Sequence, residues 1–119
     1  MKKEDLENLL LCMIIMSYID GFDSEEFDLI NKVFKEVYQG SAGELEELME
    51  NGVKDVAEYN ADGTMKDKFE SCTKALATSL EPEQKKLVLG LMMKLIKADN
   101  KITGEETDLY MKFKQFILA

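Results

Sequence analysis

The sequence contains no histidine, no arginine and no tryptophan. Without histidine, the commonest general base and the usual zinc ligand are missing. All 15 basic residues are lysine, so the planar guanidinium fork that recognises phosphate or guanine through two parallel hydrogen bonds is missing as well. These absences argue against a histidine-dependent enzyme, an imidazole-ligated zinc site and a guanine-reading nucleic-acid protein.

Proline and cysteine are nearly as scarce. The single proline, Pro82, leaves long stretches free to be helical. The two cysteines, Cys12 and Cys72, fall within apolar stripes of helical period and at unrelated spacings. Such positions are typical of buried free thiols in a reducing compartment, and we interpret them so. The alternative is a disulfide or a redox role.

The negative charge is concentrated in the first half of the chain. Residues 1–60 contain 5 lysines and 15 acids, whereas residues 61–119 contain 10 lysines and 9 acids, within a net charge of −9. Because excess negative charge is repelled by a phosphate backbone, we expect no nucleic-acid partner.

An apolar stretch, residues 9–19, follows Lys2 and Lys3, an order that is also found in targeting signals. It is shorter than the roughly 20 apolar residues that a membrane-spanning helix needs. Acidic residues precede it and no small-residue cleavage site follows it. We therefore expect a buried core helix, no membrane insertion and a cytoplasmic protein.

Apolar residues recur at the spacing of an α-helix throughout the chain, and no stretch alternates with the period of a strand. The sequence predicts an all-α fold: one domain over residues 1–119, a bundle of about seven helices. We expect helices at about residues 4–19, 23–40, 41–51 with a short continuation to 59, one containing 69–80, one beginning at Pro82, and one from about 103 to the end.

Several residues mark where these helices should begin. Turns are expected at Asp20-Gly21 and over residues 60–63. Pro82 suits the first turn of a helix, where its missing N–H does not matter. Capping-box spacing, an N-cap side chain followed three residues later by a glutamate, occurs in three pairs: Asp23 with Glu26, Ser41 with Glu44, and Thr103 with Glu106.

The two ends of the chain repeat one pattern when the sequence is shifted by about 79 residues. Residues 10–16 then lie over 89–95, Asp20-Gly21 over Asp99-Asn100, and, after a one-residue gap, Glu25-Glu26 over Glu105-Glu106. Repeat units at about residues 4–40 and 82–119, with central helices at 41–81 between them, therefore predict a pseudo-twofold arrangement with the most apolar helices inside.

The two turns, residues 19–26 (IDGFDSEE) and 98–106 (ADNKITGEE), resemble the paired turn motifs of the TerB-like, tellurite-resistance family. A domain of that family also occurs in a membrane-anchored DnaJ-type co-chaperone. In the motif a small residue precedes Asp-Gly, an apolar residue follows, and a glutamate opens the next helix. The likeness covers nearly the whole chain. It departs from the family where the first turn is one residue shorter and where Asn100 replaces glycine.

The resemblance implies a bundle of about seven helices with a negatively charged face that binds a divalent metal. It also implies a part in bacterial stress-response assemblies, some membrane-associated, through protein partners and without catalysis. The positions that match the family motif are Asp20, Glu26, Asp99 and Glu106, with Asp23, Glu25 and Glu105 as neighbouring candidates.

Carboxylates without histidine or paired cysteines suit a hard cation, so the candidate ions are Ca²⁺, Mg²⁺ and Mn²⁺. The alternative is purely structural: Asp20 and Asp99 fix turns, and Glu26 and Glu106 complete helix caps. We expect no EF-hand, because the twelfth loop position, which requires glutamate, holds Tyr110 counted from Asp99 and Phe69 counted from Glu58. No nucleophile–base set, phosphate loop or cofactor motif is visible, so we expect neither an enzyme nor an organic cofactor.

Two further features have both a structural and a functional interpretation. We interpret the methionines on the most apolar helices as core residues, and the alternative is a pliable groove that binds partner helices. We interpret a strip of lysines as a solvated face, and the alternative is a surface that binds an acidic partner or an anionic membrane. The methionines are Met13, Met16, Met92 and Met93, and the strip comprises Lys85, Lys86, Lys94 and Lys97.

Overall fold

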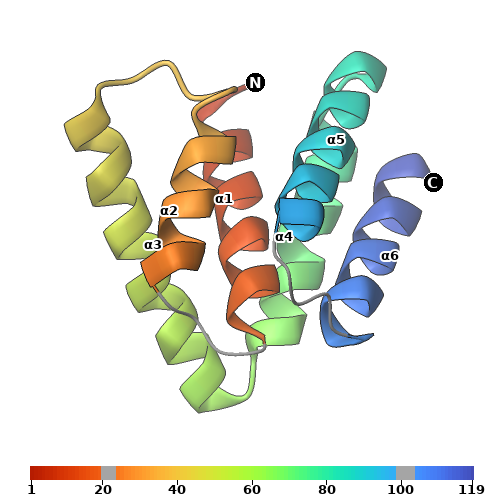
Figure 1. Cartoon of the computed structure of the whole chain (residues 1–119). Helices are drawn as coiled ribbons and strands as arrows, with labels where there is room; N and C mark the ends of the chain where they lie inside the picture. Colours follow the sequence, from red (N-terminus) through yellow and green to blue (C-terminus); the bar gives the residue numbers. More distant parts are fainter. Residues whose placement is uncertain (20–23, 99–103) are drawn as a thin grey trace.

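The computed structural model describes residues 1–19, 24–98 and 104–119 (Figure 1). These residues form helices and no strand, so the predicted all-α class is confirmed for the described part of the chain. Six helices are present there: α1 (Lys3–Tyr18), α2 (Ser24–Phe34), α3 (Ala42–Asp62), α4 (Met65–Ser79), α5 (Pro82–Ala98) and α6 (Gly104–Leu118).

Helix α1 is the centre of the bundle. It packs against each of the other five helices, and Figure 1 shows it between α2 and the helices α4 and α5. From Leu9 to Met16 its apolar residues point in nearly every direction, which is why this helix takes the central place. Its buried residues include Leu9, Leu10, Cys12, Met13, Ile14, Ile15 and Met16.

The core is filled by aliphatic side chains, methionines and a few aromatic rings. Phe69 of α4 and Phe113 of α6 are almost fully buried, and their ring centroids lie 6.3 Å apart. Met13, Met16 and Met92 are buried as well, which agrees with a core role. Both cysteines are buried and form no disulfide, as their positions in the apolar stripes predict.

The predicted break in the third helix at Asn51-Gly52 is wrong. Helix α3 runs through both residues, so the described residues hold six helices where about seven were expected. The reason is packing: Gly52 is buried, and a Cβ added to it would lie 2.6 Å from Cδ1 of Ile14 in α1. The glycine serves a close approach between two helices and does not end one.

Two helix ends also differ from prediction. Helix α2 stops at Phe34 and not near Gly40, and a turn bonded from Val37 N to Phe34 O at 3.1 Å follows. Helix α3 extends to Asp62, so the loop expected over residues 60–63 is reduced to its last residue and Thr64. Gly63 ends α3 with φ of +73°, a left-handed conformation that suits glycine.

The helix starts that lie within the described residues agree with prediction. Ser41 is the N-cap of α3, and its hydroxyl accepts a hydrogen bond from the Glu44 N–H at 3.2 Å. Pro82 is the first residue of α5, where the Gln84 side chain accepts from the Glu81 N–H at 3.0 Å. The predicted caps Asp23 and Thr103 lie outside the described residues.

None of the helices in the described ranges is long and apolar enough to cross a membrane. This includes α1, which contains the apolar stretch of residues 9–18.

Replacing Gly90 by alanine should stabilise the protein by about 0.5–1 kcal/mol. Gly90 lies inside α5, is exposed, and a Cβ there would meet nothing within 4 Å. Alanine therefore gains helix propensity without a clash. Urea denaturation of Gly90→Ala would measure the gain, and a loss of stability would contradict the open surroundings of Gly90.

Candidate functional site

The two acidic helix starts belong to α2 and α6, which both pack against α1 and α5. Helix α2 packs against α1, α3 and α5, whereas α6 packs against α1, α4 and α5. Figure 1 shows α1 and α5 between α2 and α6. The helices that carry the acidic starts therefore flank the two helices that the sequence identifies as the most apolar.

The first turns of α2 and α6 present their glutamates in the same way. Glu25 and Glu105 are exposed to solvent, whereas Glu26 is half-buried and Glu106 is only 3% exposed. In both helices the first glutamate of the pair thus faces water and the second faces the protein. A carboxylate in a first turn is stabilised by the positive end of the helix dipole, which helps to offset the loss of water at the inner position.

The inner glutamates are distinguished from ordinary surface acids by their burial. Oε2 of Glu26 is shielded from solvent, and Glu106 is one of four buried polar side chains in the described part of the chain, together with Asp5, Ser17 and Thr73. Glu26 and Glu106 each take part in an interaction with the protein. Their positions suit helix capping. The same carboxylates could also be ligands of a cation, but further oxygen ligands would be needed to complete such a site.

The remaining candidate ligands, Asp20, Asp23 and Asp99, lie outside the described residues. Among residues 1–19, 24–98 and 104–119 no group of three or more histidine, cysteine, aspartate or glutamate side chains is arranged to hold a metal ion. The described glutamates alone therefore do not make a complete cation site.

The basic strip on α5 is largely solvated. Lys86, Lys94 and Lys97 are exposed, and Lys85 is half-buried. Lys94 Nζ lies 2.7 Å from Oε1 of Glu36, which follows α2, so this lysine ties α5 to the end of α2. Because both side chains are about half exposed, the ion pair contributes at most about 1 kcal/mol. The strip agrees with the solvated-face interpretation.

A hollow of about 640 Å³ lies along the outer side of α6, and sequence reasoning did not identify it. Two of its apolar side chains, Met111 and Leu118, are 56% and 59% exposed. The signal was present in the sequence, because both residues fall outside the buried stripe of α6. The lining residues are Lys66, Glu105, Asp108, Leu109, Met111, Lys112, Lys114, Gln115 and Leu118.

Comparison with known proteins identifies a family. The family described as "Tellurite resistance protein TerB" matches residues 6–117, which is nearly the whole chain. No curated protein and no solved structure matches the sequence. The match includes most of α1 and the starts of α2 and α6. The chain therefore belongs to the TerB family.

Proposed function

We propose that this protein is a non-catalytic accessory module that binds a divalent cation through its two acidic helix starts and acts through protein partners in a bacterial stress-response assembly. The observation that supports the proposal most directly is the inward glutamate at the start of both α2 and α6. Glu26 is half-buried and Glu106 is almost fully buried, although each has an exposed glutamate just before it.

A cation would be favoured at such a place on electrostatic grounds. Carboxylates lose hydration on burial, and a positive ion restores the interaction that water no longer supplies. Asp20 and Asp99 precede the two helices in the sequence at matching positions and are the candidates for completing the ligand set. With oxygen ligands only, the site would take Ca²⁺, Mg²⁺ or Mn²⁺. The pseudo-twofold relation between the two ends of the chain belongs to the same proposal.

The second candidate is a protein-interaction domain that needs no metal. Two observations favour it. The described residues contain no group of three or more side chains arranged to hold a metal ion, and Met111 and Leu118 are exposed at the hollow beside α6. In this alternative Glu26 and Glu106 are structural caps. Asp20→Ala combined with Asp99→Ala would then leave partner binding in pull-down experiments unchanged.

Cation binding should raise the melting temperature. An ion present at 100 times its Kd adds about 2.7 kcal/mol, which for a chain of this length corresponds to a shift on the order of 10 °C. The measurement is a thermal melt in EDTA, Ca²⁺, Mg²⁺ or Mn²⁺, with calorimetric titration of the same ions. We expect at least one ion to give a saturable response, and Glu26→Gln with Glu106→Gln to weaken it at least tenfold.

The matched control is Glu83→Gln. Glu83 is an exposed acid in the first turn of α5 but lies outside both motifs, so its loss should leave the response to the ion intact. Flat titrations and unchanged melting temperatures with all three ions would refute the cation site and favour the metal-free alternative. A loss of affinity in Glu83→Gln as large as in the double variant would show non-specific screening of negative charge.

A further inference from the structure

The two cysteines of the chain lie on α1 and α4, two helices that pack against each other. Sγ of Cys12 lies 3.6 Å from the Thr73 hydroxyl oxygen and 4.0 Å from the Phe69 carbonyl oxygen. Phe69, Cys72 and Thr73 occupy positions i, i+3 and i+4 of α4, which form one face of a helix. The sulfur of Cys12 therefore sits against the face of α4 that carries Cys72.

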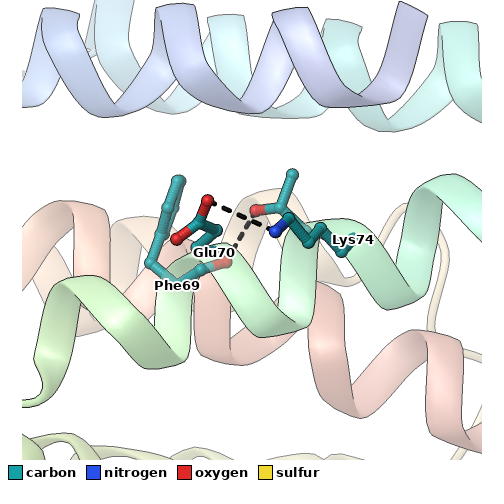
Figure 2. A network of polar contacts seen from close by, with 4 residues as sticks. Phe69, Glu70 and Lys74 are labelled. Carbon is teal, nitrogen blue, oxygen red and sulfur yellow. Dashed lines mark hydrogen bonds and ion pairs between the residues drawn. The ribbon is translucent and has the colours of Figure 1, made fainter. Parts of the chain in front are cut away.

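The polar groups around Cys12 are already arranged by α4. The Thr73 hydroxyl donates to the Phe69 carbonyl at 2.7 Å, and Figure 2 shows Phe69 on α4 one residue before Glu70. Since the Thr73 proton is used in this bond, its oxygen faces Cys12 as an acceptor. The thiol of Cys12 is thus the donor in this cluster.

Cys72 has a different environment from Cys12. The neighbouring Cys12 thiol lowers the pKa of Cys72, burial opposes this, and the Lys68 ammonium lowers the pKa further. Burial raises the pKa of Cys12 well above its usual value. Lys68 is held nearby by the Tyr59 ring of α3, with Nζ 5.3 Å from the ring centroid. Cys72 is therefore the more acidic thiol of the two.

The two thiols also differ in access. Cys12 is 0% exposed, whereas Cys72 is 9% exposed. Part of the Cys72 residue therefore meets solvent, whereas Cys12 is covered by the core. Cys72 is the more accessible residue of the two.

We propose that Cys72 and Cys12 form an oxidant-reactive dithiol, in which Cys72 reacts first with a hydroperoxide and Cys12 then closes an intramolecular disulfide between α4 and α1. The proposal does not depend on the cation site, whose candidate residues lie in the two acidic motifs. It concerns a pair of residues that an inspection of spacing alone assigns to the core.

The chemistry balances in two steps. The Cys72 thiolate attacks the terminal oxygen of the hydroperoxide, the O–O bond breaks, the sulfur is oxidised to a sulfenic acid, and the departing alkoxide or hydroxide takes up a proton. The Cys12 sulfur then attacks the Cys72 sulfur, an S–S bond forms, the S–O bond breaks, and the hydroxyl leaves as water with the Cys12 proton. Overall, two thiols and one hydroperoxide give a disulfide, one alcohol or water, and one water.

The expected consequence is a covalent bond between the central helix and the helix that packs against it most extensively. The disulfide would close a loop of about 60 residues, and a cross-link of that length restricts the unfolded chain strongly. The oxidised protein should therefore melt at a higher temperature than the reduced protein.

The experiment exposes the reduced full-length chain to hydrogen peroxide in the presence of EDTA. The native chain should lose both free thiols, lose the mass of two hydrogens and stay monomeric on a non-reducing gel. Cys12→Ala should instead accumulate a sulfenic acid on Cys72 that a dimedone probe labels. Brief alkylation of the untreated native chain should modify Cys72 well before Cys12, a measurement that needs no variant.

The lysine supplies a matched pair of variants. Lys68→Gln should slow the loss of thiols several-fold, because the nearby positive charge is removed. Lys74→Gln should leave the rate unchanged: Lys74 is also on α4 and also lies over an aromatic ring, that of Phe116, but it pairs with Glu70 (Figure 2). Circular dichroism of each variant confirms that the helices are intact.

Three results would overturn the proposal. They are a native chain that keeps both thiols at peroxide concentrations that oxidise a free cysteine peptide, oxidation that yields disulfide-linked dimers, and alkylation of Cys12 as fast as Cys72. Equal rates for the Lys68→Gln variant and the native chain would remove the role given to Lys68 in the first step.

Discussion

Replacing Phe113 by alanine is expected to lower the free energy of unfolding by about 3–5 kcal/mol. Phe113 is fully buried on α6 and packs at a tilt on Phe69 of α4. Truncation removes a whole ring from the place where these two helices meet, and the surrounding side chains of a close-packed core can fill the space only in part. Urea or thermal denaturation of Phe113→Ala would measure the loss.

The control for Phe113 lies on the same helix. Met111 is 56% exposed on the outer side of α6, so Met111→Ala should change stability by less than about 0.5 kcal/mol. A loss in Phe113→Ala no larger than that in Met111→Ala would mean that α6 does not contribute to the core as the structure shows. Met111 also lines the hollow beside α6, so the same variant tests partner binding without the complication of unfolding.

The apolar pattern was sufficient to predict the fold class and the place of α1. Residues 9–16 are apolar in almost every position, and only a helix surrounded by other helices can bury such a surface. The start of α3 was equally readable, because a serine followed three residues later by glutamate makes a local hydrogen bond that depends on no distant residue.

Helix ends that depend on distant residues were not predictable. Asn51-Gly52 is locally a turn signal, yet its glycine is required by Ile14, a residue 38 positions earlier. At Gly52 a tertiary contact thus overrides the local preference. The end of α2 is different, because the contacts of Tyr38 are local: its ring stacks on Phe34 at 5.8 Å and its hydroxyl donates to Glu44 at 3.3 Å.

The same reason limits what the sequence says about function. The capping pattern predicted that Glu106 lies in the first turn of a helix. Only the packing of α6 reveals that Glu106 is 3% exposed while Glu105 faces water. The approach of Cys12 to the face of α4 that carries Cys72 is also invisible in the sequence, because it is set by the packing of α1 on α4. Residue types and spacing identify candidates, and the fold decides which candidates are desolvated or adjacent.

Replacing Gly52 by leucine is expected to destabilise the protein by about 3 kcal/mol, at the upper end of the usual range for overpacking. Even a Cβ at this position would lie 2.6 Å from Cδ1 of Ile14, and leucine adds three further carbon atoms. The gain in helix propensity over glycine, about 1 kcal/mol, does not offset a clash in which Ile14 is itself fully buried. Denaturation curves would measure the loss, with Gly90→Ala as the control for a glycine in an open helix.

A double-mutant cycle separates the clash from every other effect of losing Gly52. Ile14→Val removes the carbon atom that a new Cβ would meet and by itself should cost about 0.5–1.5 kcal/mol. Gly52→Ala should therefore be markedly better tolerated in the Ile14→Val background than in the native chain, with a coupling of about 0.5–3 kcal/mol. If the changes in the free energy of unfolding were strictly additive, the close approach of α3 to α1 would not be the reason for the glycine at position 52.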